Sequence, residues 1–219
     1  MHRLEARFGA LDILVNNAGV GSVDTFVDTP DAHWQRVIGV NLTGTFLCSR
    51  EAVRLMQKHA IQGVVINISS TAAMTGEGPS HYCAAKAGVM GLTRSMAREL
   101  AASGIRVNTL VPGPTNTPMM ADIPDEWLQG MLKAIPLGRM GEVDEIARAA
   151  VFLASSDASF ITGQNLAVNG GMASFEPGAG NEHTTSRQDR LHYRCQLRDW
   201  CRHRPTFCPG GRHRGALRA

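Results

Sequence analysis

Three consecutive segments decide the fold: GVVINISS (63–70), YCAAKAGVMGLTRSMARELAASG (82–104) and IRVNTLV (105–111). The first and third are short apolar runs rich in β-branched residues, which is typical of buried strands. The middle segment repeats apolar residues at a helical spacing and ends at Gly104, so it predicts a helix whose buried face holds Ala85, Val89, Leu92, Met96 and Leu100. Two apolar strands joined by a helix predict a parallel pair that is covered on both faces.

The same alternation continues on both sides of these segments. LDILVNNA (11–18) and QNLAVNGG (164–171) have the length and composition of strands, and EVDEIARAAVFLAS (142–155) has a helical pattern. Thr29-Pro30-Asp31 combines a capping hydroxyl, a proline and an acid, which indicates the start of a helix that we expect to run to about Ala60. The order of elements therefore predicts an α/β fold with a doubly wound parallel sheet.

Charge divides the 219-residue chain into two parts. Residues 1–172 hold 13 Lys and Arg against 15 Asp and Glu, whereas residues 173–219 hold nine Arg, no Lys and four acids. No apolar run reaches the roughly 18 residues of a membrane span, and the N-terminus does not resemble a signal peptide. We therefore expect one globular domain over 1–172, an Arg-rich disordered tail over 173–219, no membrane association and a cytoplasmic location.

The tail contains Cys195, Cys201 and Cys208 together with four histidines. The cysteine spacings do not match the short ligand pairs of zinc sites, so we expect no metal. Arginines could bind nucleic acid weakly through phosphates, but we regard a nucleic-acid partner as the less favoured reading.

Four residues of the globular part are candidates for chemistry. Tyr82 and Lys86 lie four residues apart on one helix face, where a cation is expected to lower the pKa of the phenol from about 10 toward neutrality and make it a general acid or base. Ser70 ends a strand, where ligands of parallel sheets bind. Asn41 lies within an apolar helix and either satisfies a distortion or holds a water. A surface Tyr stacked on a Lys and a polar strand end are the simpler readings.

Two turns follow strands. NNAG (16–19) contains Asn17, Ala18 and Gly19, and PGPTNTPM (112–119) contains Pro112, Gly113, Thr115 and Thr117. Taken alone, both are ordinary turn sequences.

In order, the chain reads LVNNAG, VNLTGTF, VINISS, YCAAK, RVNTLVPG, PLGRMGEVDEIARAAVFLAS and ITGQNLAVNGG. This series resembles the central and C-terminal parts of the short-chain dehydrogenase/reductases over residues 4–172. The resemblance implies a Rossmann-like fold and an NAD- or NADP-dependent enzyme that interconverts a small-molecule secondary alcohol and a ketone. It also implies a homo-oligomer, either a dimer or a tetramer.

The resemblance assigns a role to each candidate residue. Tyr82 would exchange a proton with the substrate oxygen, Lys86 would hold the nicotinamide ribose, Ser70 would steady the substrate oxygen, and Asn41 would support a water linked to Lys86. The family usually places its serine thirteen residues before the tyrosine, at Ser69, whereas the SSTAA motif selects Ser70, which we choose. The cofactor would contact Asn17, Ala18, Gly19, Tyr82, Lys86, Pro112, Gly113, Thr115 and Thr117.

The glycine-rich turn that binds the pyrophosphate in dinucleotide folds is not found in the sequence. Only 15 residues precede Asn16, so we expect this chain to lack the first βαβαβ unit, to lack the residue that selects NAD or NADP, and to bind cofactor weakly. The alternative is a non-catalytic interaction module that associates through helices at 31–60 and 82–104. In the family, 118–135 would be a substrate lid; a simple amphipathic helix is the competing interpretation.

Overall fold

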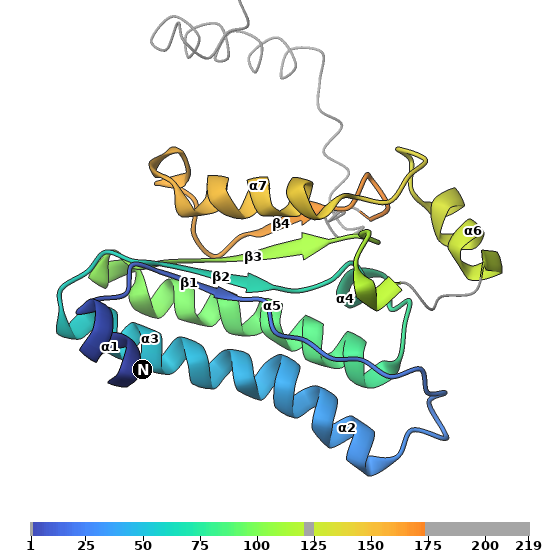
Figure 1. The fold of residues 1–219 in the computed structure, drawn as a ribbon, viewed down its shortest axis with the longest axis horizontal. Helices are drawn as coiled ribbons and strands as arrows, with labels where there is room; N and C mark the ends of the chain where they lie inside the picture. The colour runs from blue at the N-terminus through green and yellow to red at the C-terminus, as the bar shows by residue number, and fades with distance from the viewer. Residues whose placement is uncertain (1, 121–124, 174–219) are drawn as a thin grey trace, which may run out of the picture. The chain divides into compact units, whose positions relative to one another are not determined.

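A computed structural model describes residues 2–120 and 125–173, which belong to one compact unit spanning Met1–Phe175. Its centre is a sheet of four parallel strands in the order β1-β2-β3-β4 (Figure 1). The strands are β1 (Ile13–Asn16), β2 (Val64–Ile68), β3 (Arg106–Pro112) and β4 (Asn165–Val168). Because all four run the same way, their carboxyl ends, where polar side chains and turns follow, meet at one edge of the sheet.

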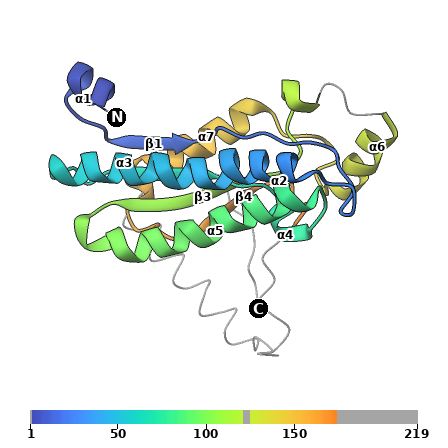
Figure 2. The ribbon, with the colours of Figure 1, turned by 90° about the horizontal axis from the view of Figure 1, so that it is seen from below.

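Helices cover both faces of this sheet (Figures 1 and 2). Helices α3 and α5 contact one face, and α7 contacts strands β2, β3 and β4 from the other. The helical segments are α1 (His2–Phe8), α2 (Asp31–Ile38), the π-helix η1 (Gly39–Gly44), α3 (Thr45–Lys58), α4 (Ala72–Thr75), α5 (Ser80–Leu100), the 3₁₀ turn η2 (Ala101–Ser103), the 3₁₀ turn η3 (Pro118–Met120), α6 (Asp125–Ala134), α7 (Val143–Ala154) and the 3₁₀ turn η4 (Ser156–Ala158). The predicted α/β, Rossmann-like, doubly wound parallel sheet is confirmed.

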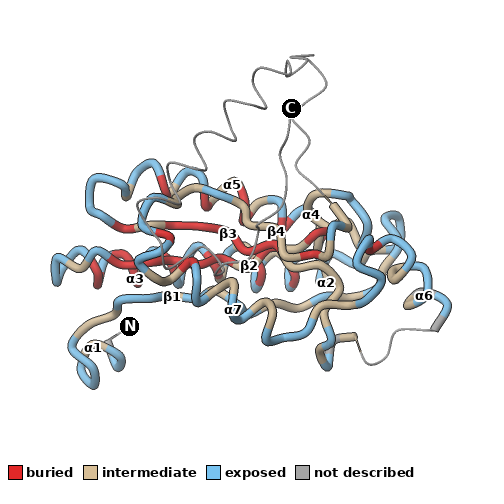
Figure 3. The backbone as a smooth tube through the Cα atoms, turned by 90° about the horizontal axis from the view of Figure 1, so that it is seen from above, coloured by how far each residue is buried: buried red, intermediate tan, exposed pale blue. Residues whose placement is uncertain are grey.

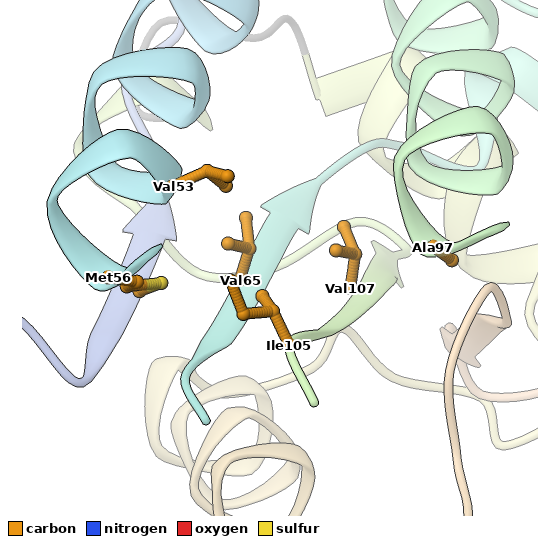
Figure 4. Packing of buried hydrophobic residues seen from close by; sticks show 6 residues of the cluster. All are labelled: Val53, Met56, Val65, Ala97, Ile105 and Val107. Carbon is orange, nitrogen blue, oxygen red and sulfur yellow. The ribbon is translucent and has the colours of Figure 1, made fainter. Parts of the chain in front are cut away.

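The pleat of β2 shows why its sequence is apolar throughout. Val65 faces α3 and α5, where it packs in a cluster with Val53, Met56, Ala97, Ile105 and Val107 (Figure 4). Its neighbours Val64 and Ile66 point to the opposite face and pack with Leu153 of α7. Successive side chains of a strand alternate between faces, so a strand covered on both sides has no polar face. The buried residues accordingly lie along the middle of the unit (Figure 3).

Local details differ from the sequence expectations in three places. Ala85 and Val89 of α5 are buried as predicted, but in the second half of the helix the buried face is shifted by one residue. Thr93 and Ala97 are buried there, whereas Leu92, Met96 and Leu100 are only partly buried. Thr29 does not cap α2; its hydroxyl donates to the carbonyl of Thr25, and Pro30 is the cap residue. The helix expected to run to about Ala60 is interrupted by the π-helical segment η1 and ends at Lys58.

Strand β1 is an edge of the sheet within the described residues. Its side chains Ile13 and Val15 are each 46% exposed, whereas Val65 and Ile66 in the neighbouring strand β2 are fully buried. β1 pairs with β2 from Ile13 opposite Val64 to Asn16 opposite Asn67. On its other side, β1 has no neighbouring strand among the described residues.

None of the described helices is long and apolar enough to cross a bilayer.

Candidate active site

The end of β2 and the first turns of α5 bring Ser70, Tyr82 and Lys86 together. The Lys86 Nζ atom lies 5.7 Å from the centroid of the Tyr82 ring, as expected for residues one helical turn apart. The Ser70 side chain lies close enough to the Tyr82 phenol to lower the pKa of Tyr82. The Lys86 ammonium donates to the carbonyl of Ile68, the last residue of β2, at 2.9 Å. The phenol, the hydroxyl and the ammonium therefore meet at the carboxyl edge of the sheet.

The two adjacent serines have different environments. Ser69 is 3% exposed, and its hydroxyl donates to the backbone carbonyl of Lys86 at 2.8 Å, so it anchors α5 to the end of β2. Ser70 is only partly buried, and its oxygen accepts a hydrogen bond from the Ala72 amide at 3.2 Å. The Ser69 hydroxyl is therefore committed to the Lys86 carbonyl, whereas Ser70 is the serine that affects the pKa of Tyr82.

Burial dominates the ionisation of Tyr82. Removal of the phenol from water raises the pKa of Tyr82 above its ordinary value of 10, and the Ser70 side chain only partly opposes this. The expectation that Lys86 lowers this pKa toward neutrality was therefore wrong. At 5.7 Å from the ring, the ammonium does not outweigh desolvation. At neutral pH the phenol is protonated and is a proton donor.

Burial also affects the ionisation of Lys86, which is only 4% exposed. Loss of hydration lowers the pKa of Lys86 to about 8. Its ammonium donates one hydrogen bond among the described residues, to Ile68, and a primary ammonium has three N–H donors. The remaining donors can serve hydroxyl groups of a bound molecule.

The Asn41 side chain fixes the loop after β1. It lies in η1, is 1% exposed, and uses both amide atoms on one residue. Its Oδ1 accepts from the Val20 amide and its Nδ2 donates to the Val20 carbonyl, both at 2.9 Å. The Asn41 carbonyl accepts from the Thr45 hydroxyl at 2.8 Å, which is compatible with the π-helical distortion. The Asn41 side chain therefore makes a tertiary contact that ties η1 to the loop after β1.

The loop that Asn41 holds passes over Lys86 and Tyr82. A Cβ atom at Gly19 would lie 3.6 Å from Lys86 Nζ and 3.7 Å from Asn41 Oδ1, and one at Gly21 would lie 4.0 Å from the Tyr82 ring. Glycines at these points keep the space above the ammonium and the phenol free of side chains. The preceding residues Asn17 and Ala18 are exposed at the same edge of the sheet.

The second predicted turn is joined to the end of β2 through Thr71. The Thr71 amide and hydroxyl both donate to the Pro112 carbonyl at 2.9 Å. Gly113 approaches the backbone of Asn169 so closely that a Cβ atom would lie 2.8 Å from its Cα. Thr115 donates its hydroxyl to the Gly113 carbonyl at 2.9 Å. Across the described part of the chain, no hydrogen bond connects Thr115 or Thr117 with Ser70, Tyr82 or Lys86.

Sequence reasoning did not identify a cluster formed by Ser22, Asp24, His33 and His81 beside this site. His81 has no exposed surface and is bonded to Asp24 and Ser22. A signal was available for His81, because it begins the buried row continued by Ala85 and Val89, and a buried imidazole needs a polar partner. The loop residue Asp24 carried no comparable signal.

Other predicted features lie partly or wholly outside the described residues. Ile123 in the expected lid and the tail cysteines Cys195, Cys201 and Cys208 are outside them, as are the side chains of Met119 and Trp127. Within the expected lid segment, residues Asp125–Ala134 form α6. In the described ranges, no group of three or more His, Cys, Asp or Glu is arranged to hold a metal ion.

Comparison with known proteins shows which family the chain resembles. The family model described as enoyl-(acyl carrier protein) reductase matches residues 1–173. The chain is 43% identical over 173 residues to 3-oxoacyl-[acyl-carrier-protein] reductase FabG of Haemophilus influenzae, covering 78% of this chain and 71% of that protein. It is 42% identical over 172 residues to 3alpha-hydroxysteroid dehydrogenase of Mediterraneibacter gnavus (78% and 68% covered). It is 44% identical over 168 residues to the (2S)-[(R)-hydroxy(phenyl)methyl]succinyl-CoA dehydrogenase subunit BbsD of Thauera aromatica (77% and 67% covered). The chain belongs to the short-chain dehydrogenase/reductase family.

Proposed function

We propose that this protein is an NAD(P)-dependent oxidoreductase that interconverts a ketone and a secondary alcohol, with Tyr82 as the proton-transfer residue. The observation that carries the proposal is the meeting of a buried phenol with a hydroxyl and an ammonium at the carboxyl edge of a parallel sheet. The names of the three relatives, a 3-oxoacyl reductase and two dehydrogenases of hydroxy compounds, support the same reaction class.

The residues present fit the nicotinamide and ribose half of the cofactor. The space above Lys86 and Tyr82 is bordered by the backbone of Gly19 and Gly21, and a side chain at either glycine would enter it. Lys86 would donate to the ribose hydroxyls with the N–H groups that Ile68 does not use, and Asn17 would border the same ribose. When bound, the nicotinamide supplies the hydride for reduction or accepts it in oxidation.

Tyr82 is proposed to act as the acid in ketone reduction. Because burial raises its pKa, the phenol keeps its proton at neutral pH and can donate it to the substrate oxygen as negative charge develops there. The Ser70 hydroxyl would hold the same oxygen, and the Lys86 charge would stabilise the tyrosinate left behind. The reverse reaction needs a tyrosinate as base, so alcohol oxidation is expected to become faster as the pH increases.

Consumption of cofactor tests the proposal. The purified 219-residue chain would be incubated with NADH or NADPH and a panel of ketones that includes a 3-oxoacyl thioester and a 3-ketosteroid. Because the sequence predicts weak cofactor binding, we expect a slow, ketone-dependent fall in absorbance at 340 nm that increases with cofactor concentration. Comparison of the two cofactors identifies the preferred one. The absence of both turnover and calorimetric cofactor binding would contradict the proposal.

A specific observation favours a second candidate function, association between subunits. The helical layer carries exposed Trp34 on α2 and exposed Phe46 and Leu47 on α3, with 43%, 43% and 42% of their surfaces accessible. Large apolar side chains that are exposed on a helical layer are typical of interfaces. We propose that the chain forms a homo-oligomer. Analytical ultracentrifugation that finds only a monomer would contradict this, and a stable oligomer without turnover would favour the non-catalytic interaction module.

A cytoplasmic location stays a prediction from the sequence.

A further inference from the structure

The Asp24 carboxylate collects donors from three separate parts of the chain. Ser22 in the loop after β1 donates its hydroxyl at 2.5 Å, His33 of α2 approaches through Nδ1 at 3.0 Å, and His81 of α5 approaches through Nε2 at 3.2 Å. The Asp24 side chain is 14% exposed and that of His81 is fully buried. Hydrogen bonds from Ser22, His33 and His81 lower the pKa of Asp24 to about 2, so the carboxylate is ionised at neutral pH.

The contacts decide which nitrogen of His81 carries a proton. An ionised Asp24 can only accept, so the single hydroxyl proton of Ser22 points to it. The Ser22 oxygen also lies 2.9 Å from His81 Nε2, and with its own proton already committed it can only accept there. His81 Nε2 is therefore an N–H donor that faces both Ser22 and Asp24. Among the described residues, His81 Nδ1 is buried without a partner. A buried unpaired N–H is costly, so the hydrogen is placed on Nε2.

This cluster is the second of two anchors on the loop that crosses the site. The first anchor is Asn41, which binds the backbone of Val20 on both sides of its amide. The second lies at Ser22 and Asp24, two and four residues farther along. Between them is Gly21, beside the Tyr82 ring. His81 directly precedes Tyr82, so the anchor is attached to the same helical turn as the phenol.

We propose that His81 is a positioning residue whose Nε2–H holds the Ser22–Asp24 loop against the first turn of α5 and thereby fixes the loop backbone at Gly21 beside the Tyr82 ring. The inference rests on the proposed function for its meaning, because the position of this backbone matters for an acid that works while shielded from water. The other histidine bonded to the Asp24 carboxylate is His33. Its side chain is 44% exposed and lies at the solvent side of the cluster. His81 is the buried partner next to the reacting group.

Side chains of different reach test the geometry. The amide nitrogen of Gln can occupy roughly the position of Nε2 in His, whereas the shorter Asn reaches only the position of Nδ1. His81→Gln should therefore keep the donor to Asp24, and His81→Asn and His81→Leu should lose it. Asp24→Ala removes the acceptor from a partly exposed site and covers the case in which a change at buried His81 prevents folding. His33→Ala is the matched control, since it removes the solvent-side partner only.

Two measurements that need no turnover read the result. The first is hydrogen exchange of the Val20 amide by NMR, which we expect to become about tenfold faster in His81→Leu, His81→Asn and Asp24→Ala, as befits the loss of one hydrogen-bonded anchor. It should stay near the wild-type rate in His81→Gln and His33→Ala. The second is the chemical shift of ¹³Cζ in labelled tyrosine, where the sequence gives only two signals, Tyr82 and Tyr193. The Tyr82 signal should move in the same three variants.

Unchanged Val20 exchange and an unmoved Tyr82 signal in folded Asp24→Ala would overturn the inference. Equal behaviour of His81→Gln and His81→Asn would also overturn it, because the position of the donor would then not matter. Failure of the chain to oxidise NAD(P)H would count against the proposed function and would leave these two measurements valid. The two failures are therefore distinguishable.

Discussion

Replacement of Lys86 by Met removes a charge that folding takes almost completely out of water. Lys86 is 4% exposed, and its ammonium donates to the Ile68 carbonyl at 2.9 Å. Methionine has a similar length and flexibility and fills the same space without a charge. The variant therefore isolates the part of the unfolding free energy that depends on the ionisation of Lys86.

The sign and size of the effect follow from the two pKa values of this lysine. The ordinary pKa of a lysine is 10.5, and burial lowers that of Lys86 to about 8 in the folded chain. Below pH 8 both states hold the proton, and the folded state bears the full cost of the buried charge. Between about pH 8 and 10.5 the folded chain has released its proton while the unfolded chain still holds it, so stability increases with pH. The whole window corresponds to roughly 3 kcal/mol.

Urea unfolding at pH 7 and at pH 10 measures this term. The free energy of unfolding of the wild-type chain minus that of Lys86→Met should rise by roughly 2.5 kcal/mol between the two pH values. The subtraction removes the contributions that both chains share, including the opposite slope that the raised pKa of Tyr82 produces above pH 10. Lys133→Met, at an exposed position on α6, should show no such rise. An equal pH dependence in wild type and Lys86→Met would refute the reasoning.

Further predictions concern the paired serines and two glycines of α5. Ser70→Ala should reduce ketone reduction by about 10²-fold, as for loss of a donor to a developing oxyanion, with little effect on stability. Ser69→Ala should instead lower the unfolding free energy by about 1 kcal/mol and leave turnover nearly unchanged, and equal losses of turnover would contradict the assignment. Gly88→Ala should destabilise the chain, because its Cβ would lie 2.8 Å from Leu42 Cδ2. Gly91→Ala meets no atom within 4 Å and should stabilise the helix by up to about 1 kcal/mol, and thermal unfolding in the reverse order would refute this.

Much of the fold could be predicted because its signals are local. The strand segments at 63–70 and 105–111 contain β2 and most of β3, since apolar runs of that length have few other solutions between helices. The interruption of the helix after α2 could not be predicted from the local sequence. It depends on a tertiary contact, the bonds of Asn41 to Val20, and the residue alone only indicated that some distortion was satisfied there. The one-residue shift of the buried face of α5 has a similar cause, since Thr93 is buried by its bonds to Asn67 and Thr109.

The juxtaposition of Tyr82 and Lys86 could be predicted from the sequence, but the electrostatics around them could not. The spacing of Tyr82 and Lys86 indicated that they share a face, and the structure places them so. The direction of the Tyr82 pKa could not be read from spacing, because it depends on how completely the loop at Gly19 and Gly21 and the end of β2 exclude water. The Asp24 cluster depends on contacts between residues as far apart as 59 positions, for which the sequence has no local pattern.

The central claim is that the Tyr82 hydroxyl transfers the proton in a hydride-transfer reaction. The most direct test compares kcat/KM for ketone reduction in wild type and Tyr82→Phe, which removes one oxygen atom and retains the ring. The account predicts a fall of at least about 10²-fold, the usual contribution of a positioned general acid, with the fold unchanged by circular dichroism. A Tyr82→Phe chain that reduces the same ketone at the wild-type rate would contradict the account.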